Sequence, residues 1–259
     1  MIRRWRYKSP NPYLRRIDHN SLQLSIFTIE LGIRRFAIKR GVFNLEKEAL
    51  LASGIIEKDR LNDYVDKIDY LQKQFIHEIK PTSDPAMRAR ALFTWLWIEK
   101  PKRYKYNGNF LLNNVIDAHL NKDSQSVGNC LGLTVFYNCL LKRMGIEADA
   151  LYLENAFGIG PHVLTLIQTK NLSIYIENIL PEGFDYKGHL SNPSRMRWGD
   201  RELVADIYHS LGNEYFEKGE LIEALKNYEI SIHLNPHHER THLDKTILLD
   251  RMGRMRRQA

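Results

Sequence analysis

Cysteine is scarce in this chain: only two occur among 259 residues, at positions 130 and 139. So few thiols argue against a secreted fold held together by disulfides. A secretory leader is not visible either, because the basic start "MIRRWRYKSPNPYLRR" is not followed directly by an apolar segment. The stretch "SLQLSIFTIELGI" is too short and too polar to cross a bilayer. We therefore expect a cytoplasmic protein without a membrane span.

The usual metal and phosphate motifs are also missing. The sequence contains no Cys-x-x-Cys, no His-Glu-x-x-His and no glycine-rich phosphate loop, and "GIGPH" is too short for a dinucleotide fingerprint. His238 and His242 have the i, i+4 spacing of a metal-binding pair, but no third ligand is evident. We therefore expect both histidines to be surface residues, and we expect neither a cofactor nor a metal.

Positive charge is concentrated at the two ends of the chain. The net charge is +7; residues 1–40 hold ten Lys or Arg, and the closing "RMGRMRRQA" holds four Arg. Such ends can bind nucleic acid through phosphate contacts. No aromatic platform or zinc-finger spacing accompanies them, so we favour a solvated basic arm at 1–43 over a nucleic-acid partner.

The middle of the chain changes from helical to strand patterns. Helices are predicted at 44–54, with Asn44 as N-cap and Gly54 as stop, at 57–79, from Asp84 through the tryptophan-rich stretch, and at 129–144. Three strands follow, "EADALYLEN", "HVLTLIQT" and "LSIYIENI". Helices followed by consecutive strands predict an α+β domain at 44–195.

The two cysteines fall on the same predicted helix. Nine residues separate them, which is roughly 13 Å along the axis, so they cannot form a disulfide with each other. Cys130 lies at the helix N-terminus, where unpaired N–H groups and the helix dipole favour a thiolate and can stabilise an oxyanion. Cys139 lies deep in an apolar run and is expected to be a core thiol.

A nucleophilic cysteine needs a base and a group that orients the base. His162 begins the second predicted strand, and Glu177 and Asn178 end the third. If these two strands pair as a hairpin around "TKN", His162 comes next to Glu177 or Asn178. The spacing thus favours a Cys–His–acid or Cys–His–amide site.

The segment "GNCLGLTVFYNCLLKRMGIEADAL", with "HVLTLI" and "IYIENILPEGF" after it, resembles the transglutaminase-like superfamily of papain-like enzymes over about residues 85–190. The resemblance implies Cys130 as nucleophile and His162 as general base. It assigns the third role to Glu177, where relatives usually carry Asp, with Asn178 as the alternative. Gln125 and Asn114 are the candidates for a side chain that stabilises the oxyanion.

Residues 205–238 are 34 residues long and resemble a tetratricopeptide repeat. They carry the Leu-Gly-x-x-Tyr signature at 211–215, then Gly219, Ala224, Tyr228 and Pro236. Gly212 and Ala224 would let two helices approach closely, and "ERTHLDKTILLDRMG" would begin a second, partial repeat. We expect a helical segment at 200–259 that either binds a protein partner or caps the core domain.

These observations predict a thiol-dependent hydrolase or acyl transferase. The Cys130 thiolate would attack an amide (peptide or isopeptide) carbonyl in a protein or peptide substrate, and hydrolysis is favoured over transfer. The alternative is a non-catalytic interaction scaffold that keeps the enzyme-like fold.

Overall fold

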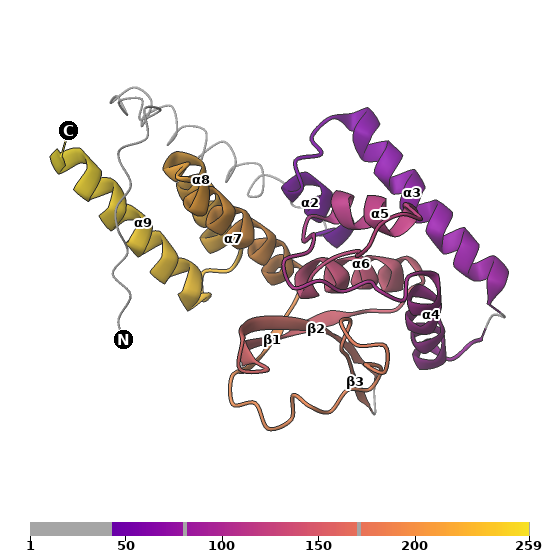
Figure 1. The fold of residues 1–259 in the computed structure, drawn as a ribbon. Helices are drawn as coiled ribbons and strands as arrows, with labels where there is room; N and C mark the ends of the chain where they lie inside the picture. Colours follow the sequence, from indigo (N-terminus) through magenta and orange to yellow (C-terminus); the bar gives the residue numbers. More distant parts are fainter. Residues whose placement is uncertain (1–42, 80–81, 170–171, 259) are drawn as a thin grey trace. The chain divides into compact units, whose positions relative to one another are not determined.

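The computed structural model describes residues 43–79, 82–169 and 172–258. The basic arm expected at 1–43 therefore lies outside the described residues, apart from Phe43. From Arg40 onward the chain forms one compact unit. Within the described residues its elements follow the order five helices, four strands and three helices (Figure 1).

Four of the five leading helices begin and end close to their predicted limits, and the helix at 112–120 was not predicted. The five are α2 (Leu45–Ala52), α3 (Lys58–Glu78), α4 (Pro85–Glu99), α5 (Leu112–Leu120) and α6 (Cys130–Arg143). The side chains of Asn44 and Asp84 each accept a backbone N–H of the first turn, at 2.9 and 2.8 Å, so both predicted N-caps are confirmed. Gly54 has φ +81°, as expected of a glycine that stops a helix.

Helix α6 forms the centre of the core. Every residue from Leu131 to Leu141 is buried, which is typical of a helix surrounded by protein on all sides. Helices α2, α3 and α5 contact it, and so does strand β2 (Gly160–Gln168), which lies across the helix from them (Figure 1). The helix ends at Arg143, and Gly145, two residues later, has the left-handed φ of +71° that is common just past a helix C-terminus.

The sheet contains the three predicted strands and a fourth. Besides β2 these are β1 (Asp149–Ala156), β3 (Ser173–Ile176) and β4 (Arg195–Trp198), paired antiparallel in the order β3-β2-β1-β4. Strand β4 gives no pattern that predicts it, because "RMRW" buries only Trp198, which stacks on Tyr152 of β1 with ring centroids 3.9 Å apart. The mixture of helices and an antiparallel sheet confirms the α+β class.

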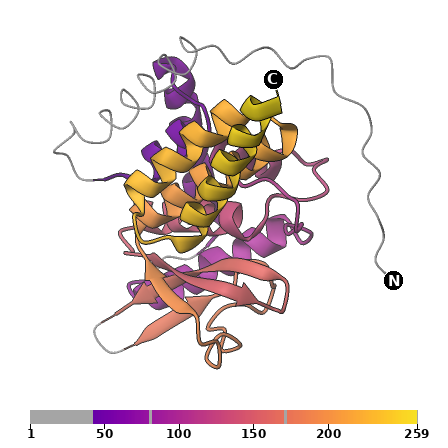
Figure 2. The same cartoon turned by 90° about the vertical axis from the view of Figure 1, so that its left-hand side faces the viewer.

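Three helices follow the sheet, as Figure 2 shows: α7 (Asp200–Lys218), α8 (Leu221–Leu234) and α9 (Glu239–Gln258). Gly212 is needed for close packing between α7 and α8, since a Cβ there would lie 2.4 Å from the Tyr228 ring. Helix α7 also contacts α2, α6, β1 and β4. The division into domains at 44–195 and 200–259 stays a prediction, and in the structure these helices pack directly on the core.

None of the helices in the described parts of the chain is both long and apolar enough to cross a membrane.

Candidate active site

Cys130 is the first residue of α6 and is partly exposed, with a free thiol. The N-cap Asn129 fixes this end of the helix, because its side chain accepts the Gly132 N–H at 3.0 Å. Gly132 must be a glycine, since a Cβ would lie 2.4 Å from the Asn109 carbonyl oxygen. Packing at position 132, which leaves no room for a larger residue, therefore holds the N-terminus of α6 in place. The position of the Cys130 thiol is fixed with it.

The β2–β3 hairpin brings the two other predicted residues together. Thr165 pairs with Ile176, so His162 on β2 comes beside Glu177, the residue after β3. His162 Nε2 lies 2.8 Å from Glu177 Oε2. Only 6% of the His162 side chain and none of Glu177 is exposed. The distance confirms the expected contact between His162 and Glu177.

Charge at the site favours a protonated imidazole. Burial alone lowers the pKa of His162, but the neighbouring Cys130 and Glu177 outweigh it and raise the pKa to about 10. Because Glu177 occupies Nε2, Nδ1 is the nitrogen left for the thiol. A buried carboxylate behind an imidazole beside a thiol is the arrangement that activates cysteine nucleophiles.

A bend in the chain places an aromatic ring against the imidazole. Phe157 lies between β1 and β2 and has φ +56°, an uncommon conformation for a bulky residue. Its ring packs edge-on to His162, with centroids 5.4 Å apart. Together with the carboxylate this contact fixes the imidazole in one orientation.

Asn178, the alternative third residue, has a different set of contacts. Its side-chain amide donates to the hydroxyls of Thr134 and Thr165 at 3.1 and 3.0 Å, inside the core between α6 and β2. The structure therefore brings Glu177, and not Asn178, to the imidazole.

The two oxyanion candidates are not brought to the thiol. Gln125 is exposed and donates to the Asp123 carbonyl at 3.3 Å, and Asn114 is exposed on α5. Neither side chain lines the pocket in front of Cys130. Tyr104, Tyr106 and Asn107 line it instead. A parallel bridge between Tyr104 and Gly128 holds this segment beside the start of α6, a long-range pairing that no local pattern in the sequence indicates.

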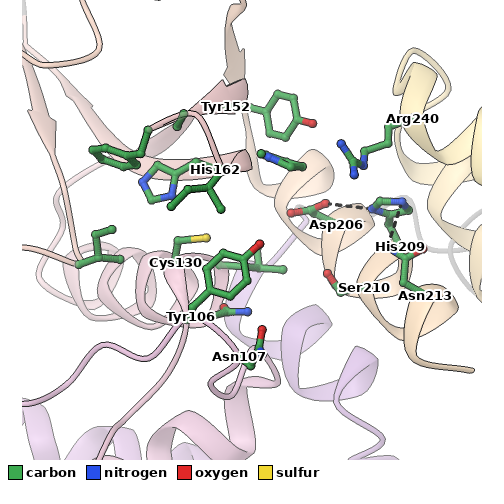
Figure 3. Close-up of a pocket in the computed structure, with 18 of the residues that line it drawn as sticks. Tyr106, Asn107, Cys130, Tyr152, His162, Asp206, His209, Ser210, Asn213 and Arg240 are labelled. Carbon is green, nitrogen blue, oxygen red and sulfur yellow. Dashed lines mark hydrogen bonds and ion pairs between the residues drawn. The ribbon is translucent and has the colours of Figure 1, made fainter. Parts of the chain in front are cut away.

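Cys130 and His162 open onto a pocket of about 280 Å³. Figure 3 shows the thiol and imidazole on one side and side chains of the C-terminal helices on the other. That second wall comes from α7 and from the residues around the start of α9, namely Asp206, His209, Ser210, Asn213, His238 and Arg240. The helices that were expected to bind a partner or cap the core therefore complete this cavity.

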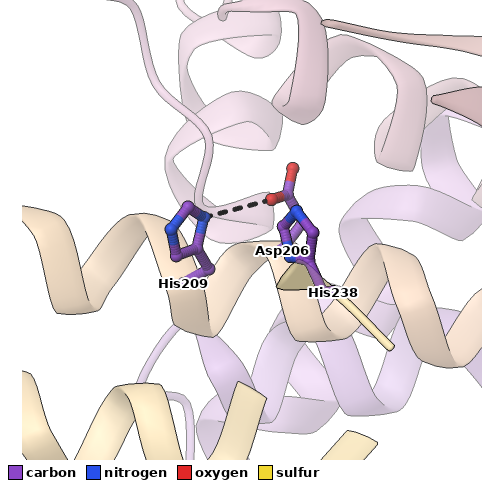
Figure 4. A group of neighbouring side chains, drawn as sticks. All are labelled: Asp206, His209 and His238. Atoms are coloured by element: carbon purple, nitrogen blue, oxygen red, sulfur yellow. Dashed lines mark ion pairs between the residues drawn. The ribbon is translucent and has the colours of Figure 1, made fainter. Parts of the chain in front are cut away.

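The same wall holds a cluster of ligand-type side chains, Asp206, His209 and His238 (Figure 4). The expectation that His238 is a surface residue is wrong, because it is 4% exposed and packs against Tyr152 and Trp198. His242 is exposed, as expected. Asp206 and His209 share the i, i+3 spacing of one helix face. That spacing is the one sequence signal for the cluster, since His238 joins it only through tertiary packing.

Comparison of the chain with protein-family models, with curated proteins and with solved structures finds no match. The chemistry of the site therefore rests on its own geometry. That geometry provides a free thiol at a helix N-terminus, a buried imidazole–carboxylate pair and an adjoining cavity.

Proposed function

We propose that this chain is a thiol-dependent hydrolase or acyl transferase that acts on amide bonds of a protein or peptide. In this proposal Cys130 is the nucleophile, His162 is the general base and acid, and Glu177 is the carboxylate that orients His162. The observation that carries the proposal is the 2.8 Å contact between His162 Nε2 and a fully buried Glu177, beside Cys130 at the mouth of α6. The succession of a cysteine-headed helix and an antiparallel sheet supports a transglutaminase-like, papain-like core. The sequence of "IYHSLGNEYF" and the close packing at Gly212 support a tetratricopeptide-type segment after it.

The reaction proceeds in two steps. The Cys130 thiolate attacks the amide carbonyl carbon and forms the C–S bond of a tetrahedral oxyanion. The oxyanion collapses to a thioester as the C–N bond breaks and protonated His162 gives its proton to the leaving amine. Neutral His162 then takes a proton from water, whose oxygen attacks the thioester. The acid product leaves and the Cys130–His162 pair is restored. An amine in place of water would give transfer, and we favour hydrolysis.

Two groups of donors suit the oxyanion. The backbone N–H groups of Cys130 and Leu131, in the first turn of α6, have no hydrogen-bond partner among the described residues and both residues line the pocket. Tyr104 is the candidate side chain. Burial first and then the nearby Cys130 raise the pKa of its hydroxyl, so this group lies close to the sulfur and stays a donor at neutral pH.

Alkylation of the thiols tests the proposal without knowledge of the substrate. Both cysteines are treated with iodoacetamide at neutral pH and their labelling rates are followed by peptide mass spectrometry, in the folded chain and in urea. Folding should raise the alkylation rate of Cys130 above its rate in the unfolded chain, because His162 and the helix dipole stabilise its thiolate. Folding should lower the alkylation rate of Cys139, because that residue is buried. The substitution His162→Ala should lower the alkylation rate of Cys130 at least about tenfold.

The comparison with the unfolded chain is the decisive control, since Cys139 is slow for the trivial reason of burial. If folding slows Cys130 as well, or if His162→Ala leaves its rate unchanged, the enzyme proposal fails and the non-catalytic scaffold takes its place.

A further inference from the structure

The cluster across the pocket from Cys130 gathers three metal-ligand side chains from two segments. Asp206 and His209 lie on α7 and His238 lies just before α9. One ligand atom from each lies within 4.8 Å of the others (Figure 4). Both histidines are 4% exposed. Histidines buried to this degree beside a carboxylate require a reason beyond solubility.

Each histidine is oriented by a partner on its other ring nitrogen. His209 Nε2 lies 2.8 Å from Asp244 Oδ2, and His238 Nδ1 lies 2.9 Å from the Thr241 hydroxyl. These contacts leave His209 Nδ1 and His238 Nε2 as the ligand atoms on the side of Asp206. Among the described residues, the only other hydrogen-bond partner of His238 Nε2 is the Tyr152 hydroxyl at 3.4 Å, a long contact that a metal ion would replace. An imidazole whose second nitrogen donates to a carboxylate or hydroxyl is the usual form of a metal-binding histidine.

The spacing also fits a metal. His209 Nδ1 lies 3.5 Å from Asp206 Oδ1. Two ligands of a tetrahedral zinc ion, at bond lengths of about 2.0–2.1 Å, lie roughly 3.3 Å apart. A protonated His209 held between Asp206 and Asp244 would explain that distance as well. It does not explain why His238, whose own contacts are the hydroxyls of Thr241 and Tyr152, also brings a ring nitrogen to within 4.8 Å of the ligand atoms of Asp206 and His209.

We propose that Asp206, His209 and His238 bind one divalent cation of the zinc type, with its remaining coordination position open to the pocket. Imidazole and carboxylate ligands suit such borderline metals. An ion held there could accept an oxygen of a molecule in the same cavity as Cys130. The proposal does not depend on the thiol chemistry, because Cys130 is not a member of the cluster.

Metal binding is measured on the full chain after removal of metals with a chelator. Zn²⁺ should bind with a stoichiometry of one per chain in equilibrium titration. Co²⁺ in its place should give the visible bands of nitrogen and oxygen ligands without a sulfur-to-metal charge-transfer band. Asp206→Asn and His238→Gln should each weaken binding at least about tenfold, and Asp244→Asn, which loosens His209, should weaken it roughly 10- to 100-fold.

Two variants serve as matched controls. His242→Gln changes an exposed histidine near the start of α9 whose ring nitrogen lies 2.9 Å from the Pro236 carbonyl oxygen, and this variant should bind Zn²⁺ as the unaltered chain does. Cys130→Ser should also bind unchanged, which separates this site from the thiol.

The proposal is overturned if no Zn²⁺ binds to the folded chain, or if binding survives His238→Gln, or if it is lost in Cys130→Ser. Circular dichroism of each variant shows that the fold is kept. The alkylation rate of Cys130 in the metal-free chain reports on the proposed enzyme independently, so either proposal can fail alone.

Discussion

Each half of helix α6 carries one cysteine and lies against one buried histidine from another element, His162 on β2 or His119 on α5. The two pairs are in opposite states along the helix. At its N-terminal end the thiol of Cys130 faces a pocket beside His162. Farther along, Cys139 is buried, and another buried histidine, His119, packs against Phe136 with ring centroids 5.4 Å apart. One buried imidazole is thus associated with a pocket and a partly exposed thiol, and the other with an apolar core.

The difference comes from charged partners and not from burial, because both histidines are almost fully buried. Beside Glu177 and Cys130 the pKa of His162 is raised to about 10. Burial lowers the pKa of His119 to about 3, and the positive charges of Arg103 and Lys100 lower it further. Burial likewise raises the pKa of Cys139 well above its usual value. A carboxylate with no exposed surface is what converts a core histidine into a charged one.

Removal of the Glu177 carboxylate should have the largest effect on the contrast between His162 and His119. In Glu177→Gln the imidazolium loses its counter-charge, so alkylation of Cys130 at neutral pH should slow by at least about tenfold. The difference in alkylation rate between Glu177→Gln and the unaltered chain should shrink above a pH of about 9, where free thiols are ionised. Iodoacetamide labelling across a pH series measures both.

Asn178→Ala is the control for that change. It removes the amide that bonds Thr134 and Thr165, so it should lower the free energy of unfolding by about 1–3 kcal/mol and leave the pH profile of Cys130 as it was. A profile altered equally by both substitutions would contradict Glu177 as the orienting residue.

His119, which packs against the apolar half of α6, should make the protein less stable in acid. His119 has a folded pKa of about 3 and an unfolded value near 6.5. Between these values only the unfolded state binds the proton, so the stability that His119 contributes is present above pH 6.5 and is lost as the pH falls toward 3. The free energy of unfolding should decline by up to roughly 1 kcal/mol per pH unit.

Urea unfolding between pH 7 and pH 4 checks this expectation. His119→Leu should flatten the decline, while Cys139→Ala, in the same half of the helix, should not alter its slope. An acid decline of the same steepness in His119→Leu would assign it to other groups.

The smallest predicted effect is the difference between removing the N-cap of α6 and removing the N-cap of α2. Asn129→Ala and Asn44→Ala each remove an N-cap, and each should cost about 1 kcal/mol in urea unfolding. Only Asn129→Ala frays the turn that holds Cys130, so only it should slow the alkylation of that thiol, by a few-fold. Equal labelling rates in the two variants would mean that the cap has no influence on the thiol.

The half of the pocket that holds the thiol was predictable from local signals. The cap at Asn129 and the stop at Gly145 define α6, and the short turn between β2 and β3 sets a register that leads His162 to Glu177. The choice between Glu177 and Asn178 depends on that register to the single residue, which the sequence left open. Pairing of Thr165 with Ile176 puts Glu177 on the His162 face of the hairpin and Asn178 on the other face, and a slip by one residue would reverse the choice.

The opposite wall was hidden for a different reason. A repeat pattern predicts α7 and α8 but not the surface on which they pack, so His238 and Asp206 carried no sign of a shared cavity. The segment with Tyr104 and Tyr106 was missed in the same way, and Gln125 and Asn114 were preferred because they precede the cysteine in sequence. Tertiary docking between distant segments decides which side chains line a cavity, and periodicity does not report it.

The wall that α7 and the start of α9 contribute has a consequence for the order in which the protein matures. Cys130, His162 and Glu177 are synthesised before residues 206–240. Until α7 and the start of α9 dock, the proposed nucleophile, base and carboxylate lack the wall that Asp206, His209 and Arg240 contribute to the pocket. Newly made chains should pass through a stage in which the thiol is most accessible to small reagents and least able to select what it meets.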